Sequence, residues 1–246
     1  MNCKRLSANF ISLSSVDSTN NYAANLVKET NVANGTTILT KRQYSGKGQR
    51  GNSWLSEDEK NLIFSVVLYP SIKFDRVFYL NIVASLAIAK TLKDLGLAVK
   101  VKWPNDILIG DKKVAGILIE NQLQGQLIKH SIVGIGLNVN QKEFPKENKA
   151  TSLFLEMGVE QELEIVFNQF FKYLDFYYDL LEQGNYKVLL SRYYESLYRY
   201  QQWSRYSTNE TEFFGMIKGI DETGLLIVQT ESTVKKFDLK EIAFLR

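Results

Sequence analysis

Apolar residues recur along this chain with spacings that predict strands in its first third, followed by a helix. Short apolar runs bounded by turn residues predict strands over residues 10–16, 36–43 and 61–69. Between Val77 and Leu95, apolar residues recur every three or four positions, and Gly96 follows. This spacing predicts an amphipathic helix that ends at the glycine. A shorter helix is expected over residues 21–27, after a run of residues that favour a helix start, Asp17, Ser18 and Thr19.

The middle of the chain has the pattern of a sheet and is followed by helical periodicity. Strands are expected over residues 99–103, 113–122 and 126–138, with turns at Gly110-Asp111 and Gln124-Gly125. Because these strands are close together in the sequence, they favour antiparallel neighbours over alternating βαβ units. Helices are expected over residues 162–182 and 186–199, and their Phe and Tyr residues fit packing better than cofactor stacking.

The C-terminal end changes to short strands separated by turns. These strands are expected over residues 213–220, 225–229, 234–239 and 242–245. They indicate a small β-barrel appended to a larger α/β body. We therefore expect one domain over residues 1–200 and a second over residues 201–246.

The composition is that of an ordinary globular protein. Of the 246 residues, 45% are hydrophobic and 23% are charged, and the net charge is +3. This charge is too small to indicate a nucleic-acid-binding protein. The N-terminus has no apolar signal core, and no apolar run reaches the about 18 residues of a membrane span. With a single cysteine, Cys3, the chain fits a reducing compartment, and we expect a cytoplasmic protein.

The single histidine limits the chemistry that the chain can perform. His130 lies in a strand-like run, so it fits a sheet residue better than a catalytic base. Hydrolases of the common triad type need an imidazole beside the nucleophile, and zinc sites usually need several His or Cys ligands. Catalysis therefore has to depend on positioned charges and backbone dipoles.

Residues 46–54 carry the strongest chemical signal in the chain. Three glycines let the backbone bend and expose its N–H groups. Lys47 and Arg50 add positive charge, and Trp54 adds a flat apolar face. This combination predicts a loop that handles a nucleotide. The glycines also fit the dinucleotide fingerprint, but a strand-like run follows them, with no helix and no Gly-Lys-Ser/Thr ending, so Rossmann and P-loop interpretations fail. A flexible basic surface loop is the structural alternative.

Four further polar clusters stand out, and three of them have a structural alternative. Ser18-Thr19-Asn20 could simply start a helix, and Asn105-Asp106 could form a turn between strands. Lys112-Lys113 could be a solvated hairpin tip. The fourth cluster, residues 134–138, places two glycines inside an apolar strand, which indicates close contact of the backbone with another group.

Taken in order, these clusters resemble the biotin protein ligase family. The matching elements span nearly the whole chain and are Asp17-Ser18-Thr19-Asn20, Gln43 with residues 46–51 and Trp54, Lys-Trp-Pro-Asn-Asp at 102–106, Lys113-Val114-Ala115-Gly116, residues 134–138 and Thr151-Ser152-Leu153. The resemblance implies an α+β fold, with a mixed-sheet catalytic domain of the biotinyl/lipoyl-ligase type and an SH3-like C-terminal β-barrel. It also implies two half-reactions. Biotin and MgATP give biotinyl-5′-adenylate, and a lysine of a biotin carboxyl carrier protein then takes the biotinyl group.

The resemblance further implies a role for each matching residue. Biotin is expected to contact Ser18, Thr19, Asn20, Gln43, Gly46, Lys47, Gly48, Gln49 and Lys113. The nucleotide is expected to contact Arg50, Trp54, Asn105 and Asn138. Lys113 and Asp106 are expected to be catalytic, Asp106 near the transfer step. No residue is assigned to Mg²⁺, which is expected to arrive with ATP, and no tightly bound prosthetic group is expected.

The glycine segment departs from the family pattern, which commonly reads Gly-Arg-Gly-Arg. Here Lys47 keeps the charge but loses the bidentate fork of arginine, and Gln49 has no charge. We therefore predict weaker retention of the adenylate than in relatives that have arginine at the position of Gln49.

Two other functions are compatible with parts of the sequence. Lipoate–protein ligases are related acyl-adenylate enzymes. Their loop has a sequence similar to Arg-Arg-x-Ser-Gly-Gly-Gly, and they lack the Lys-Trp-Pro-Asn-Asp motif, so this sequence disfavours them. A non-enzymatic protein that only binds a nucleotide or docks a partner is the second alternative. Since Asp17 is close to Met1, no DNA-binding winged helix and no nucleic-acid partner are expected. Monomer and homodimer both remain open.

Overall fold

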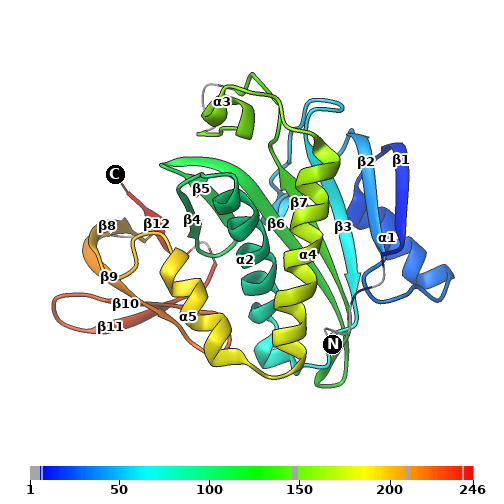
Figure 1. Ribbon diagram of the computed structural model, residues 1–246. Helices are drawn as coiled ribbons and strands as arrows, with labels where there is room; N and C mark the ends of the chain where they lie inside the picture. The colour runs from blue at the N-terminus through cyan, green and yellow to red at the C-terminus, as the bar shows by residue number, and fades with distance from the viewer. Residues whose placement is uncertain (1–5, 7, 146–148, 209–210, 240, 246) are drawn as a thin grey trace.

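A seven-stranded mixed sheet forms the centre of the molecule (Figure 1). The computed structural model describes residues 6, 8–145, 149–208, 211–239 and 241–245. In spatial order the strands are β1 (Phe10–Val16), β2 (Thr37–Gln43), β3 (Leu62–Leu68), β7 (Leu127–Leu137), β6 (Lys112–Gln124), β5 (Asp106–Ile109) and β4 (Val99–Lys102). Strands β1 and β2 are parallel and the other neighbours are antiparallel, so the predicted antiparallel pairing in the middle of the chain is confirmed.

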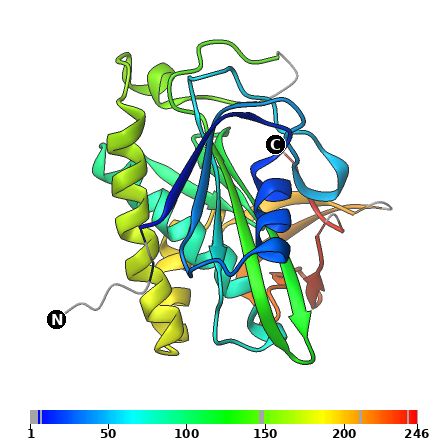
Figure 2. The ribbon, with the colours of Figure 1, turned by 90° about the vertical axis from the view of Figure 1, so that its right-hand side faces the viewer.

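Helices cover both faces of this sheet (Figure 2). On one face lie α2 (Phe78–Asp94), α4 (Leu163–Glu182) and α5 (Tyr186–Ser196), which share the main apolar core with the sheet. On the other face, α1 (Thr19–Glu29) buries a smaller apolar cluster around Ala23, Ile38 and Val67. None of the described helices combines the length and the apolar composition needed to cross a bilayer.

Alternating side chains along β7 and the neighbouring part of β6 separate core residues from the residues of the opposite face. Ile117, Ile135 and Leu137 point into the main core. Because successive side chains of a strand point to opposite faces, the alternate positions face the side of α1. Those positions include Gly116, Gly134 and Gly136, so this part of the sheet presents bare backbone.

The C-terminal end is an antiparallel five-stranded sheet, in the order β11-β10-β9-β8-β12. Its strands are β8 (Trp203–Ser207), β9 (Glu212–Ile220), β10 (Leu226–Gln229), β11 (Val234–Phe237) and β12 (Ala243–Phe244). The expected SH3-like C-terminal unit is thus present, and in the described residues its outer strands do not pair with one another, so the sheet is not a closed barrel. The boundary near residue 200 remains a prediction.

Sequence patterns did not predict three of the elements. Strand β8 was missed because it buries only Tyr206 fully, and β5 was missed because the proline before it indicated a turn. The third missed element is the short helix α3 (Leu153–Met157). Two 3₁₀ turns, at Gln49–Gly51 and Phe74–Arg76, complete the fold.

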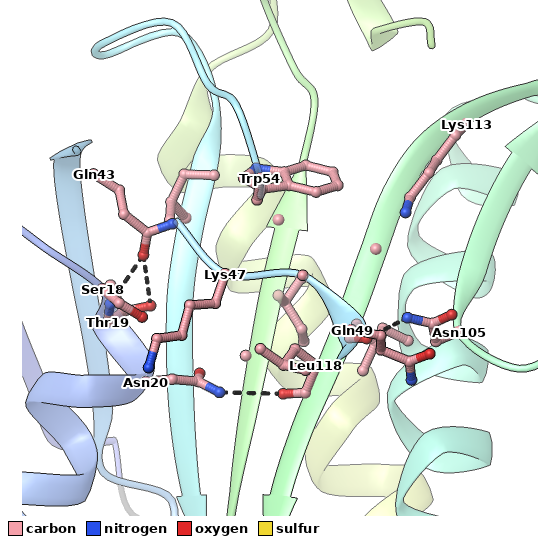
Figure 3. Close-up of a pocket in the computed structure, with 17 residues that line it drawn as sticks. Ser18, Thr19, Asn20, Gln43, Lys47, Gln49, Trp54, Asn105, Lys113 and Leu118 are labelled. Atoms are coloured by element: carbon pink, nitrogen blue, oxygen red, sulfur yellow. Dashed lines mark hydrogen bonds between the residues drawn. The ribbon is translucent and has the colours of Figure 1, made fainter. Parts of the chain in front are cut away.

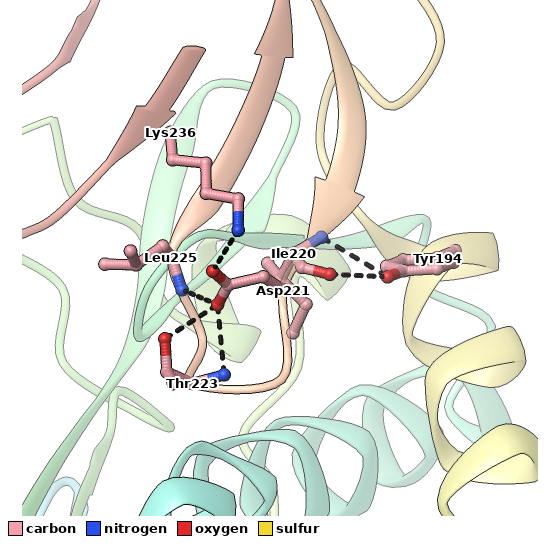
Figure 4. A network of polar contacts seen from close by, with 6 residues as sticks. All are labelled: Tyr194, Ile220, Asp221, Thr223, Leu225 and Lys236. Carbon is pink, nitrogen blue, oxygen red and sulfur yellow. Dashed lines mark hydrogen bonds and ion pairs between the residues drawn. The ribbon is translucent and has the colours of Figure 1, made fainter. Parts of the chain in front are cut away.

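One turn, residues 221–225, attaches the C-terminal sheet to the larger body (Figure 4). The Asp221 carboxylate accepts hydrogen bonds from Thr223 N at 3.0 Å and Leu225 N at 3.1 Å. It also pairs with Lys236 Nζ at 2.9 Å. Next to this turn, the Trp103 indole N–H donates to the Gly224 carbonyl at 2.9 Å in a buried contact. Hydrogen bonds within the turn therefore hold its shape, and the bond from Trp103 joins it to the segment between β4 and β5.

Candidate functional site

The floor of the candidate site is the bare backbone of β6 and β7. Gly116 and Gly136 are directly paired across the two strands. A Cβ atom added to Gly136 would lie 2.3 Å from the Trp54 ring, and one added to Gly134 would lie 2.3 Å from Asn20 Oδ1. The prediction that glycines in this strand allow a close contact is therefore confirmed, and the contacting groups are Asn20 and Trp54.

Asn20 is held in place by residues on two strands of the large sheet. Its Oδ1 accepts a hydrogen bond from Ser65 at 2.6 Å, and its Nδ2 donates to Glu120 at 2.7 Å. Ser65 Oγ also lies 2.7 Å from Thr19 Oγ1. Neither Ser65 nor Glu120 was predicted from the sequence, although Ser65 stands out as the single polar residue within the apolar strand β3.

The start of α1 presents its polar groups to the site. Ser18 is the N-cap residue, but its side chain makes no capping hydrogen bond, so the purely structural alternative for this cluster does not hold. The Thr19 backbone N–H instead donates to Gln43 Oε1 at 2.9 Å, which ties the end of β2 to the start of α1. The structure thus brings together four residues predicted to bind biotin, Ser18, Thr19, Asn20 and Gln43.

Residues 46–54 form a small hairpin above the floor, which we call the glycine hairpin. Trp54 N donates to the Gly46 carbonyl at 2.9 Å, and Gly48 N donates to the Asn52 carbonyl at 2.6 Å. No helix opens after the last glycine, in agreement with the rejection of the Rossmann interpretation. The Trp54 indole lies on the paired glycines, and its buried Nε1 has no hydrogen-bond partner among the described residues.

Lys113 enters the site from β6, on the side opposite α1 (Figure 3). Its Nζ lies 2.6 Å from Asp106 Oδ1 and 5.4 Å from the centroid of the Trp54 ring. Its backbone N–H donates to the Lys149 carbonyl at 2.7 Å. Lys113 is therefore a fixed, paired side chain, and the solvated hairpin tip is ruled out for it, whereas its neighbour Lys112 is exposed.

Two adjoining hollows share Trp54 and Lys113 as a common wall. The inner hollow has a volume of about 50 Å³ and lies between α1 and the strand glycines. The outer hollow has a volume of about 500 Å³ and is lined by Asn138, Gln141, Phe144 and Lys149, among others. The arrangement can hold two ligands that meet at a lysine.

The outer hollow contains a buried amide with unused hydrogen-bonding capacity. Asn138 is 3% exposed, and its Nδ2 donates to the Thr151 carbonyl at 3.0 Å. Its Oδ1 has no hydrogen-bond partner in the described part of the chain. A buried acceptor of this kind suits a ligand that carries an N–H group.

The remaining predicted residues take different places. Gln49 and Gly48 line the inner hollow, as does Asn105, whose Nδ2 donates to the Ile117 carbonyl at 2.7 Å. Lys47 also borders the hollow, but its ammonium binds Asn21 Oδ1 at 2.6 Å. The side chain of Arg50 lies outside the described part of the structure.

Comparisons with known proteins show which family this chain belongs to. The model of the biotin/lipoate A/B protein ligase family matches residues 12–138. The chain belongs to this family. A second model, of the biotin protein ligase C-terminal domain, matches residues 207–239. Together these matches confirm the biotin protein ligase resemblance, including its C-terminal part.

Individual relatives agree with this assignment. The bifunctional ligase/repressor BirA of Bacillus subtilis is 30% identical over 91% of this chain and 69% of its own length. The biotin–[acetyl-CoA-carboxylase] ligase of Paracoccus denitrificans is 35% identical over 52% of this chain and 53% of its own length. Among solved structures, the biotin protein ligase of Aquifex aeolicus in complex with biotin and ATP is 30% identical. It aligns with a TM-score of 0.81 over 98% of this chain and 100% of that one.

Proposed function

We propose that this protein is an ATP-dependent biotin protein ligase that forms biotinyl-5′-adenylate and transfers biotin to a lysine of a carrier protein. The observation that carries the proposal is the pair of hollows that meet at Lys113 and Trp54. The relationship to a ligase whose structure contains both biotin and ATP gives the two ligands their identity.

The inner hollow suits the fused rings of biotin. The ureido group of biotin carries two N–H donors and one carbonyl acceptor, and it needs fixed polar partners when it is buried. Ser18, Thr19, Asn20 and Gln43 supply hydroxyl and amide groups at one end of the hollow. The strand glycines form the floor of this hollow and let the Trp54 ring and Asn20 lie close against the backbone.

The outer hollow suits the nucleotide. Adenine carries an exocyclic amino group, and the free Oδ1 of Asn138 can accept a hydrogen bond from it. Trp54, at the wall between the hollows, offers an apolar face to the base or to the valeryl chain. The assignment of Arg50 and Asn105 to the nucleotide rests on the resemblance alone, since Asn105 lines the inner hollow.

The first reaction joins two anions, so repulsion between them is its main obstacle. A carboxylate oxygen of biotin attacks the α-phosphorus of ATP, the bond to the β-phosphate oxygen breaks, and pyrophosphate leaves with the electron pair. Lys113 lies where the two hollows meet, so its ammonium can stabilise the charge that develops there. Positioning of the two reactants supplies much of the remaining acceleration, and no histidine is required.

The second reaction requires an amine and a base. The lysine amine of the carrier attacks the acyl carbon of the adenylate, the bond to AMP breaks, and the amine loses a proton. Asp106 lies beside Lys113 and can accept that proton once Lys113 turns to the phosphate. This swap of partners explains why the two residues are paired in the absence of substrate.

Magnesium is proposed to enter as part of the substrate pair with ATP. Over the described residues, no group of three or more His, Cys, Asp or Glu side chains is placed to hold a metal ion. The triphosphate oxygens would thus provide most of its ligands.

A biotin carboxyl carrier protein is the proposed acceptor of the biotinyl group, and the cytoplasm is the proposed location of the protein.

Biotin-dependent exchange of pyrophosphate into ATP tests this function directly. We expect exchange with biotin and none with lipoate, and exchange with lipoate alone would establish the lipoate ligase instead.

Lys113→Ala should reduce the exchange rate about 100-fold or more, because it removes the cation at the reacting phosphate. Lys112→Ala is the matched control, since Lys112 is the exposed neighbour on the same strand and should keep the wild-type rate. A chain that binds ligands without any exchange would establish the non-enzymatic alternative.

A further inference from the structure

Lys47 of the glycine hairpin does not turn its charge toward the wall where biotin and ATP meet. Its ammonium donates to Asn21 Oδ1 at 2.6 Å, in the first turn of α1. Figure 3 shows this side chain extending from the hairpin toward the start of α1, while Lys113 approaches from the other side. The contact therefore joins the hairpin to the helix across the rim of the inner hollow.

Asn21 is itself oriented by a third residue. Its Nδ2 donates to Asp17 Oδ2 at 2.5 Å, four residues earlier. Since one end of the amide is held by the carboxylate, the carbonyl end has to face outward, where it meets Lys47. The hydrogen bond from Asn21 lowers the pKa of Asp17, and Lys47 adds to this effect although burial opposes it. Asp17 is thus ionised at neutral pH and polarises the amide toward the ammonium.

The hairpin is anchored at one end by the Trp54 ring on the strand glycines and at the other by its base, while its tip is fastened to itself. Ser45 N donates to the Asp17 carbonyl at 2.9 Å, just before the hairpin begins. Within the hairpin, the backbone hydrogen bonds join Gly46 to Trp54 and Gly48 to Asn52. These internal bonds shape the tip without fixing where it lies relative to α1, so the Lys47–Asn21 bond acts on the position of the tip.

We propose that Asp17, Asn21 and Lys47 form a latch that holds the glycine hairpin over the inner hollow and slows release of the adenylate. This inference rests on the proposed function for its ligand. It assigns positioning roles to Asn21 and Asp17, and it gives Lys47 a role away from the reacting carboxylate. The latch lies at the protein surface, so its strength should fall as salt concentration rises.

A double-mutant cycle of Asn21→Ala and Lys47→Met tests the latch. The enzyme is loaded with labelled biotinyl-adenylate, and release is followed after a chase with unlabelled adenylate. Each single variant should release the adenylate about fivefold faster, since one charge-assisted hydrogen bond at an exposed site is lost. The double variant should release it no faster than either single variant, because both changes break the same bond.

Asn25→Ala is the matched control, since Asn25 is an exposed asparagine one turn further along the same helix. Asn21→Ala and Asn25→Ala both replace asparagine by alanine in the same helix, so the effect of helix propensity on the release rate cancels when the two variants are compared. Wild-type release rates in the two single variants, or additive effects in the double variant, would overturn the latch.

Hydrogen exchange of residues 44–56 in the ligand-free chain provides a second readout that does not need catalysis. Asn21→Ala should raise exchange across the hairpin, and Asn25→Ala should leave it unchanged. If the wild type formed no adenylate, the proposed function would fail while this measurement still decided the latch. Equal exchange in all three proteins would contradict the latch by itself.

Discussion

The glycine hairpin and the turn at residues 221–225 solve a similar packing problem in different ways. Both involve a glycine pressed against an aromatic ring, Gly136 under Trp54 in one case and Gly224 against Phe78 in the other. This packing holds the Trp54 end of the hairpin, whereas its tip is attached to α1 by the exposed hydrogen bond from Lys47 to Asn21. The turn is braced by a carboxylate with several partners and by the buried bond from Trp103.

This difference shows which part of the site is able to move. A tip held by one exposed contact opens at low free-energy cost, whereas a turn with several partners and the buried bond from Trp103 opens less readily. The hairpin is thus suited to admit and retain ligands. The turn is suited to fix Trp103, which precedes Asn105 and Asp106 by two and three residues. We infer that the C-terminal sheet acts as a rigid support for the catalytic segment.

Replacing Gly224 should give the largest loss of stability. A Cβ at this position would lie 2.3 Å from the Phe78 ring, and the residue has a φ of +96°. Gly224→Ala should therefore lower the free energy of unfolding by about 3 kcal/mol, from overpacking and backbone strain together. Urea unfolding measures this loss. Gly125→Ala is the control, because it has a φ of +64° but open space, and it should cost only about 1 kcal/mol. Equal losses in the two variants would contradict the rigid support.

Removing the charge of Asp221 should give a smaller loss that depends on pH. Burial alone would raise the pKa of Asp221, but Lys236, Thr223 and the Leu225 N–H together lower it below 3.8. A lowered pKa contributes stability that is complete above the unfolded value and is lost as pH falls through the folded value. Asp221→Asn should cost about 1 kcal/mol at pH 7 and progressively less below pH ~4. Urea midpoints across this range measure the effect, and a cost independent of pH would refute it.

A change within the hairpin should leave stability nearly unchanged and alter ligand retention instead. Gln49 lines the inner hollow without any charge. Gln49→Arg should slow release of the adenylate about threefold, since a guanidinium can bind the phosphate. The chase assay described above measures this rate. Equal release from the wild type and the variant would show that the missing arginine does not limit retention.

The sequence predicted the parts of this molecule that depend on local pattern. The glycine hairpin, the start of α1 and the paired strands of the middle region all follow from spacing and residue type. The site also depends on contacts between distant residues, such as Asn20 with Glu120 and Trp103 with Gly224. No local pattern encodes these pairs, because they arise from the register of the sheet and from the docking of a turn.

Two features of the C-terminal sheet could not be predicted from local pattern. Strand β8 was missed because only one of its side chains is buried, which leaves no apolar alternation to detect. Four short strands predicted the small SH3-like unit correctly, but how its outer strands pair depends on contacts that the local pattern does not define. Lys47 was assigned to biotin by resemblance, and its contact with Asn21 became visible only in three dimensions.

The most direct test of the central claim is a crystal structure of this chain with biotinyl-5′-adenylate bound. The claim predicts the biotin rings against Asn20 and Gly134, the adenine beside Asn138, and the phosphate within about 3 Å of Lys113 Nζ. The glycine hairpin should lie across the ligand with Lys47 still on Asn21. A ligand bound away from Lys113 and from the hairpin would contradict the account.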